Sequence, residues 1–431
     1  MTGTRLRARW SGSVQSVRRI VGDAAAMLLA AQLVAASVAF VVNVLAARVL
    51  EPAGRGELAL LLQIAYVGSL GLLLGVNRSV IPVYAGEPVR AVTRAFLRLL
   101  VAPSAVGLAV AFGLLALPAA GSWRMALAVA VLFAVVNAFA RSVRAIAIAG
   151  GRHAEYLRHT LLSNGLLTAA IVPLFLLEVR ESTLWLLAYL VVGAVAAALW
   201  FLRRGLSGGA LGDPADPTDP ADPARLREAR REGLKLLPFA LARSGVMRFD
   251  RFLLVGIAST AALGVYASVA TMTELVAWPL VAYADSRLGR WRTQNDRGEL
   301  RMRMLLLPAA AYSVVAATVM VGVTHLLLPL LGPAYRSAET LIVPLCAAAG
   351  IFGMTHLAVS LLIALRRSAL ASIVEIIGFG VSMIGYIVLI SRYDALGAAY
   401  GSLLGYLSCL AVAGVGLAVG RRVSRPEPGE C

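Results

Sequence analysis

The chain is poor in charged residues and in cysteine. Only 15% of its 431 residues are charged, 59% are hydrophobic, and the mean hydropathy is +0.80. This balance excludes an ordinary soluble domain and indicates a polytopic membrane protein. The three cysteines, Cys346, Cys409 and Cys431, have no CxxC spacing, so we expect neither a disulfide framework nor a metal site built on thiolates.

Lysine is almost absent, although the net charge is +17: Lys235 is the only lysine among 40 basic residues. A nucleic-acid-binding protein needs a soluble basic face with aromatic platforms, and the sequence offers neither, so we expect no nucleic-acid partner. Enzyme motifs are also missing. Gly205-LSGG matches a Gly-x-Ser-x-Gly string but lies in a loop, and no phosphate-binding Gly-Lys-Ser/Thr loop occurs. We therefore predict a protein that is not an enzyme and that holds no cofactor or metal.

Long runs without charge fill most of the sequence, and most are near or above the ~20 residues that a spanning helix needs. They predict an all-α membrane protein of about twelve spans. The predicted spans are 22–48, 56–82, 97–119, 123–149, 159–178, 182–203, 234–258, 262–285, 304–331, 338–364, 368–391 and 395–420.

The basic residues divide unequally between the two sides of these spans. One side, which includes both termini, carries 30 of them, and the other carries only six: Arg48, Arg55, Arg124, Arg180, Arg336 and Arg392. Cytoplasmic loops carry the excess of Arg and Lys in membrane proteins. We therefore expect a multi-pass protein of the inner (cytoplasmic) membrane with both termini in the cytoplasm.

The chain divides into two halves around a linker. We predict a basic cytoplasmic N-terminus over 1–21, an N-lobe over 22–203, a disordered Asp/Pro-rich linker over 204–233, a C-lobe over 234–420 and a cytoplasmic tail over 421–431. Aligning Gly56 with Gly264, 208 residues later, brings similar stretches into register. Both halves begin on the same side, so the repeat is parallel.

The seventh predicted span, Leu234–Ala258, is apolar but carries Arg243, Arg248, Asp250 and Arg251. A charge at the centre of a bilayer costs at least ~2.5–3.5 kcal/mol, so these side chains should face protein or water. Arg248 lies about 18 Å into the span at 1.5 Å per residue, close to the midplane. The span therefore predicts a polar interior.

Four patches, spread over almost the whole chain, resemble one family of membrane proteins. They are Ala47-RVLEPAGRGELALLL, Asp250-RFLLVGIASTAALGVYASVATM, Leu331-GPAYRSAETLIVPL and Leu396-GAAYGSLLGYL. In order and spacing they are similar to the oligosaccharide and lipid-linked glycan flippases of the MATE-like superfamily, the multidrug/oligosaccharidyl-lipid/polysaccharide exporters. Glu51 stands where that family usually has glycine.

The resemblance implies two six-helix lobes around a central cavity that opens alternately to each side. It implies movement of a polyprenyl-diphosphate-linked oligosaccharide to the outer leaflet for polysaccharide biosynthesis, with membrane lipid and the glycosyltransferases and polymerase of the same pathway as partners. An ion-coupled multidrug or metabolite exporter on the same fold is the alternative, and a membrane glycan polymerase or ligase is a further one. The glycan, the coupling ion and the oligomeric state stay open.

Such a substrate needs a cationic interior for its diphosphate, and arginine donates in pairs to phosphate oxygens. Each candidate also has a structural alternative, such as an interhelical ion pair or a side chain that reaches the cytoplasmic surface. The candidate substrate-binding cations are Arg248, Arg251, Arg243 and Arg78; those for ion coupling or charge balance are Glu274, Asp250 and Glu375; those for sugar contacts are Asn43, Gln63, Tyr66, Asn137 and Asn164. Arg141 and Arg144 are interpreted as a solvated helix end.

Overall fold

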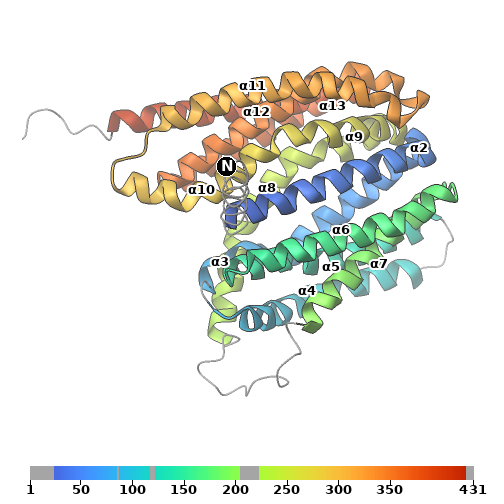
Figure 1. Ribbon diagram of the computed structural model, residues 1–431, viewed down its shortest axis with the longest axis horizontal. Coiled ribbons are helices and arrows are strands. Elements are labelled where there is room, and N and C mark those ends of the chain that lie inside the picture. The colour runs from blue at the N-terminus through green and yellow to red at the C-terminus, as the bar shows by residue number, and fades with distance from the viewer. Residues whose placement is uncertain (1–23, 85–86, 117–121, 204–222, 424–431) are drawn as a thin grey trace, which may run out of the picture.

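The structure is a computed structural model that describes residues 24–84, 87–116, 122–203 and 223–423. Helices make up nearly all of this part of the chain, and no strand occurs in it (Figure 1). The α-helices are α2 (Ala24–Leu73), α3 (Val76–Val83), α4 (Val89–Ala116), α5 (Ser122–Ala149), α6 (His153–Leu176), α7 (Ser182–Phe201), α8 (Pro223–Ile257), α9 (Thr260–Thr273), α10 (Trp278–Asp296), α11 (Met302–Leu327), α12 (Glu339–Ala364) and α13 (Ser368–Val423), with the short 3₁₀ helices η2 (Glu274–Val276), η3 (Leu328–Leu331) and η4 (Pro333–Ala338) between them.

The two longest helices, α2 and α13, are hairpins of two spans each. Glu51 in α2 and Asp394 in α13 have positive φ angles, 56° and 48°, which break the helical path. Sixteen residues span about 24 Å along a straight helix. The hydroxyl oxygens of Tyr386 and Ser402, sixteen residues apart, nevertheless lie 3.0 Å from each other. The chain therefore folds back on itself at Asp394.

Twelve spans follow from these helices, as the sequence predicts. Eight described helices are long and apolar enough to cross a membrane, and each hairpin adds one span. The pair α9 and α10, bent by 48° at η2, forms another. The last is α8, whose 35 residues are long enough but carry the charges of the seventh predicted span. The chain is an all-α polytopic membrane protein.

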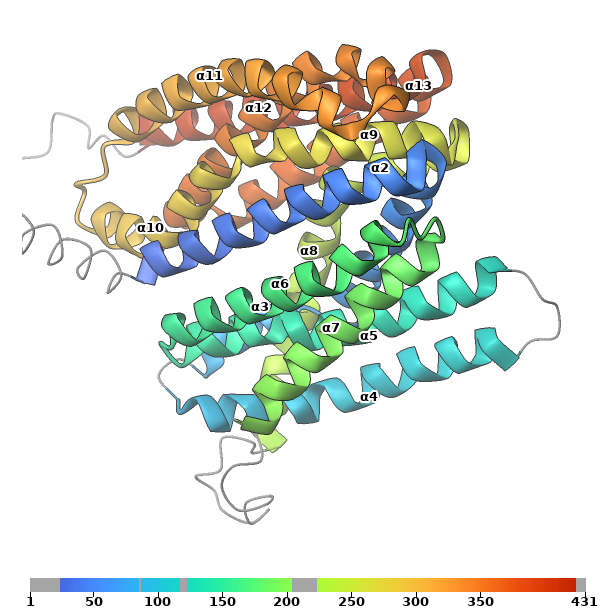
Figure 2. The same ribbon diagram turned by 45° about the vertical axis from the view of Figure 1, so that its right-hand side comes forward.

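The spans form two groups, each with its own apolar core (Figures 1 and 2). The N-lobe contains α2 to α7, and its core includes Phe133, Trp185 and Leu186. The C-lobe contains α8 to α13, and its core includes Tyr266 and Leu341. The lobes also pack against each other, since Ala59 and Leu60 of α2 are buried together with Tyr266 and Leu341 of the C-lobe.

One predicted boundary is wrong. The sequence predicts a linker over 204–233, but Pro223 begins α8, and its first turns pack on α3 of the N-lobe. Ser79 donates a hydrogen bond to the carbonyl of Ala229 at 2.6 Å, and Arg225 pairs with Glu87 at 2.9 Å. Four arginines and two glutamates follow the Asp/Pro run, and such a sequence forms a helix once one face is buried. Residues 204–222 lie outside the described part, as do the predicted N-terminus and most of the tail.

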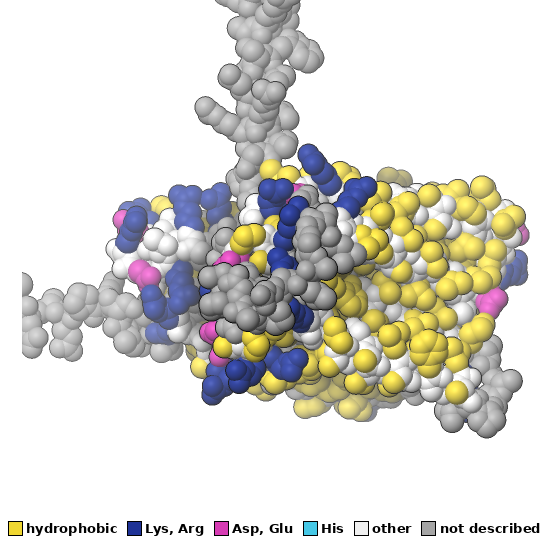
Figure 3. Space-filling view, turned by 90° about the horizontal axis from the view of Figure 1, so that it is seen from below, with side chains coloured by type: hydrophobic (Ala, Val, Ile, Leu, Met, Phe, Trp, Pro, Cys, Tyr) yellow, Lys and Arg dark blue, Asp and Glu magenta, His cyan; other side chains and the backbone are white. Residues whose placement is uncertain are grey.

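The two ends of the bundle differ in charge. We call the end with Glu51, Asp394, η3 and η4 the kink end, and the opposite end, where α2 begins and α13 finishes, the terminus end. Figure 3 shows Lys and Arg side chains gathered at the terminus end, with hydrophobic side chains over the rest of that face. This is the division of charge that the sequence predicts, and it marks the terminus end as the cytoplasmic side in our prediction.

The lobes touch backbone to backbone at the kink end. A Cβ atom added to Gly56 would lie 1.7 Å from the carbonyl oxygen of Thr260, and one added to Gly264 would lie 1.8 Å from that of Pro52. The two glycines that the repeat aligns thus meet each other, in a reciprocal contact of the kind that a two-fold relation produces. Arg48 also donates across the lobes, to the carbonyl of Leu330 at 2.6 Å. The kink end is closed.

Candidate functional site

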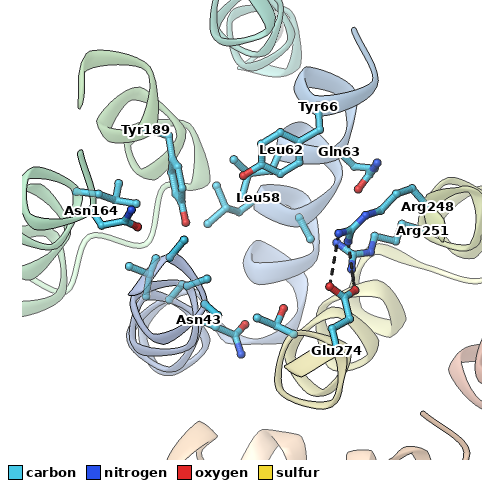
Figure 4. Close-up of a pocket in the computed structure, with 18 of the residues that line it drawn as sticks. Asn43, Leu58, Leu62, Gln63, Tyr66, Asn164, Tyr189, Arg248, Arg251 and Glu274 are labelled. Carbon is cyan, nitrogen blue, oxygen red and sulfur yellow. Dashed lines mark hydrogen bonds and ion pairs between the residues drawn. The ribbon is translucent and has the colours of Figure 1, made fainter. Parts of the chain in front are cut away.

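A cavity of about 420 Å³ lies between the lobes, on the terminus side of the Gly56–Gly264 contact. Its N-lobe face comes from α2, α5, α6 and α7, and its C-lobe face from α8, α9, η2 and α10 (Figure 4). The size is within the usual range of ligand sites. The cavity is therefore the candidate ligand site of the described residues.

Positive charge dominates the lining. Four arginines line the cavity, Arg55, Arg141, Arg248 and Arg251, and Glu274 is the one carboxylate among the described lining residues. At neutral pH the lining therefore carries a formal charge of +3, four positive charges against one negative. In a site partly removed from water this charge acts strongly, because the screening is weak.

The C-lobe arginines share Glu274, as Figure 4 shows. Arg248 approaches both carboxylate oxygens, at 3.2 and 3.4 Å, and Arg251 donates to one of them at 2.8 Å. The sequence predicts that these three side chains meet, and the structure brings them together. Such charge-assisted pairs offset the cost of holding each group away from water.

Arg55 is a cavity residue that the sequence assigns to an outer loop. It is only 7% exposed, and its Nε and Nη2 atoms donate to Asn43 Oδ1 at 3.1 and 2.8 Å. Its Nη1 atom has no hydrogen-bond partner among the described residues. Pro52 carries the missed signal: proline favours the first helical position, so a helix starting there contains Arg55.

Arg141 is the second corrected residue. The sequence favours a solvated helix end, but Arg141 lines the cavity from α5, with its guanidinium 5.9 Å from the centre of the Tyr66 ring. A cation over an aromatic face is stabilised by the ring. The Nε atom of Arg141 is buried without a partner in the described part of the chain. Eight residues of α5 follow Arg141, so its depth in the helix was the available signal.

Polar uncharged side chains complete the N-lobe face. Asn43 donates to the carbonyl of Ser268 at 2.9 Å, which ties it to the C-lobe. Gln63 is 1% exposed, and neither atom of its amide has a partner among the described residues. Tyr66, Asn164 and Tyr189 also line the cavity; Tyr189 is not among the residues that the sequence singles out. Amides and phenols of this kind hydrogen-bond the hydroxyls of sugars.

Several predicted site residues lie elsewhere. Arg78 is exposed on α3, outside the cavity lining. Asn137 donates to Ser69 at 2.9 Å and joins α5 to α2. Asp250 is buried behind the lining, where it accepts from Tyr266 at 2.5 Å, and Glu375 is buried in α13. The backbone of Arg243 belongs to α8, but its side chain lies outside the described residues.

The four lining arginines are spread along the axis of the bundle. Arg55 comes four residues after Glu51, about 6 Å from the kink end, and Arg251 comes seven residues before Ala258, about 10 Å from that end. Arg141 comes nineteen residues after Ser122, about 28 Å from it. A charged group crossing the cavity would meet these cations in succession.

No protein-family model matches the chain, and no curated protein matches its sequence. Solved structures do match. The MATE multidrug transporter DinF-BH superposes with a TM-score of 0.64 at 14% identity, over 94% of this chain and 96% of its own. This protein has the MATE transporter fold.

Two further structures support that assignment. An inward-facing multidrug resistance MATE family transporter of the MOP superfamily gives a TM-score of 0.62 at 15% identity, over 91% of this chain and 97% of its own. A MOP superfamily transporter from Pyrococcus furiosus, for which a reverse polarity of the binding pocket suggests a different function, gives 0.56 at 17% identity, over 93% and 95%. The resemblance predicted from sequence is confirmed for the fold.

Proposed function

We propose that this protein is a flippase that moves a polyprenyl-diphosphate-linked oligosaccharide across the inner membrane, from the cytoplasmic to the outer leaflet. The observation that carries the proposal is the lining of four arginines against one glutamate. A diphosphate is the anionic part of such a substrate, and planar guanidinium groups bind its oxygens in pairs without losing their charge.

The rest of the lining fits the sugars. Asn43, Gln63 and Asn164 offer amides, and Tyr66 and Tyr189 offer hydroxyls beside ring faces on which a pyranose can lie. A cavity of about 420 Å³ is smaller than a whole lipid-linked oligosaccharide. The polyprenyl chain therefore stays in the bilayer, where its apolar surface is kept away from water, while the head group enters the cavity.

Alternating access follows from the contacts between the lobes. With the kink end closed at Gly56 and Gly264, rocking of the lobes about a central axis would open that end and close the other. We place the termini in the cytoplasm; the closed kink end then faces outward, and the substrate enters from the cytoplasmic leaflet. The glycosyltransferases that build the glycan and the polymerase that uses it would then be partners on opposite sides of the membrane.

A multidrug or metabolite exporter is the second candidate, because several of the matching structures are described as multidrug transporters. The polarity of the cavity argues against cationic drugs, since a formal charge of +3 repels them. A glycan polymerase or ligase has less support. At the kink end, the described connections between helices are short: Leu177–Glu181 joins α6 to α7, and Ala258–Ser259 joins α8 to α9.

The test is transport by the purified protein in liposomes. A short-chain polyprenyl diphosphate bearing a labelled disaccharide is supplied to one leaflet, and its appearance in the other is followed with a lectin. We expect the wild-type protein to move this lipid and not a cationic dye, and the Arg248→Gln/Arg251→Gln double variant to lose at least ~90% of the rate while staying folded. Transport of the dye alone would overturn the proposal.

A further inference from the structure

Glu274 is the only described carboxylate in a cavity lined by arginines, and it pairs with two of the four. It contacts both C-lobe cations: its two oxygens face Arg248, and one of them also accepts from Arg251. The Glu274 side chain is 33% exposed, against 11% for Arg251. The carboxylate is therefore reachable from the cavity, and Arg251, which also lines it, is less exposed.

The same residue stands at a break in the helix. Thr273 ends α9, Glu274 begins η2, and α10 starts at Trp278 at an angle of 48° to α9. Trp278 also lines the cavity. The backbone at Glu274 is thus less constrained than inside a continuous helix, and the carboxylate can move without unwinding a regular turn.

We propose that Glu274 is a built-in counter-anion, which the anionic group of the substrate displaces from Arg248 and Arg251 on binding and which returns to them on release. This inference rests on the proposed function, because it needs an anionic cargo. When the diphosphate enters, its oxygens take over the hydrogen bonds from both guanidinium groups, and the carboxylate turns toward water in the cavity. No bond is made or broken apart from hydrogen bonds.

The exchange solves a physical problem for a transporter. Two unpaired guanidinium groups in a weakly screened cavity would hold a diphosphate too tightly for release. Conduction and transport need binding that is strong enough for entry and weak enough for exit. With Glu274 present, the substrate gains contacts that the carboxylate loses, so the net free energy of binding is small and the site resets itself when the cargo leaves.

The N-lobe arginines show what the site would be without such an anion. Arg55 is bonded to the neutral Asn43, and Arg141 lies over the ring of Tyr66; the structure gives neither a carboxylate partner within the described residues. These two cations attract an anion continuously. Glu274 makes the C-lobe face different, since its two arginines become available only when an anion competes for them.

Binding of inorganic pyrophosphate and of a short-chain polyprenyl diphosphate to the purified protein tests the exchange. We expect Glu274→Gln to bind both at least ~10-fold more tightly than the wild type and to transport the lipid several-fold more slowly, because release becomes limiting. Glu274→Asp keeps the charge but is shorter by one methylene, so we expect it to bind ~2- to 3-fold more tightly. The matched control is Asp296→Asn, which removes a carboxylate from an exposed pair with Arg366 at 3.1 Å outside the cavity and should leave binding unchanged.

The outcomes separate the two proposals. If Arg141→Gln weakens binding while Glu274→Gln leaves it unchanged or weaker, the anionic cargo stands and the exchange is wrong. If neither diphosphate binds to the wild type or to Glu274→Gln, both proposals fail. Binding that depends on added sodium and disappears in Glu274→Gln would instead assign the carboxylate to a coupling cation. Thermal unfolding of each variant shows whether it is folded. If Glu274→Gln does not fold, the affinity of Glu274→Asp for the diphosphates tests the exchange in its place.

Discussion

The two faces of the cavity carry different kinds of positive charge. On the N-lobe face, Arg55 is buried and Arg141 is half-buried, each beside a neutral partner, and the described lining there contains no carboxylate. On the C-lobe face, Arg248 and Arg251 are held by Glu274. The N-lobe thus contributes a formal charge of +2 and the C-lobe +1. A strongly basic lining can thus have half of its cations paired with a carboxylate of the protein until a competing anion binds.

Reversing a charge on the N-lobe face should have the largest effect. Arg141→Glu removes one attractive charge and adds a repulsive one; at ~5 Å and an effective dielectric constant of ~20, each is worth about 3 kcal/mol. We expect transport of the diphosphate lipid to fall by at least ~100-fold in liposomes. Arg141→Lys keeps the charge and should retain a measurable rate. Equal rates in Arg141→Glu and the wild type would show that the substrate never approaches this face.

Forcing the two lobes apart at the kink end should have the second largest effect on transport. A side chain at Gly264 would place its Cβ within 1.8 Å of the Pro52 carbonyl, so Gly264→Ala prevents the closed contact and favours the state that is open at the kink end. We expect transport to fall by ~10-fold, and a cysteine introduced at Ala59 to be labelled faster by a reagent added on that side.

The control for that variant is Gly256→Ala, at the end of α8, where an added Cβ would meet nothing within 4 Å. It should leave both transport and labelling as in the wild type. Labelling that is equally slow in Gly264→Ala would mean that the helices separate by sliding along each other, and that the glycine contact is not the closure.

These contrasts also show what the sequence can and cannot reveal. Hydropathy and the distribution of arginines predict twelve spans and their two ends, because both depend on properties that are local along the chain. The meeting of Arg248, Arg251 and Glu274 was also predictable, since depth in a helix follows from counting residues. Arg55 was missed because the hairpin at Glu51 leaves no loop: the chain reverses at one residue with a φ of 56°, and the basic residue four positions later is already inside the lobe.

For a related reason, the sequence leaves Arg78 open between the cavity and the cytoplasmic surface. Counting residues places it within the second span, but α2 ends at Leu73, and Gly75, with a φ of 74°, precedes the separate helix α3. A break of this kind turns the following residues to a new direction, so the helical periodicity of α2 does not predict which way the side chains of α3 face. Whether a charge in a span faces the cavity therefore depends on helix continuity, which the sequence does not report.

Substitutions of two amides on the N-lobe face, Gln63 and Asn43, should affect transport alike but stability differently. Gln63 has no partner in the described part of the chain, so Gln63→Leu removes a buried polar group without breaking a bond, and the free energy of unfolding should stay equal or rise. Asn43 bonds both Ser268 and Arg55, so Asn43→Leu should lower it by about 1–3 kcal/mol. We expect transport to fall severalfold in both variants, and thermal unfolding in detergent to distinguish them. Equal melting temperatures would mean that the bonds of Asn43 contribute nothing measurable.

The smallest effect is expected for Arg78→Gln, which makes the same chemical change as Arg141→Gln at a position outside the cavity lining. Removing a charge from the exposed face of α3 leaves the potential inside the cavity almost unaltered, because water screens an exposed charge within about 10 Å at ordinary salt. Transport should therefore stay within about twofold of the wild type, whereas Arg141→Gln should lose most of it. If the transport rates of both variants fall equally, the rate depends on the net charge of the whole N-lobe. A cation that lines the cavity then acts no differently from one outside it.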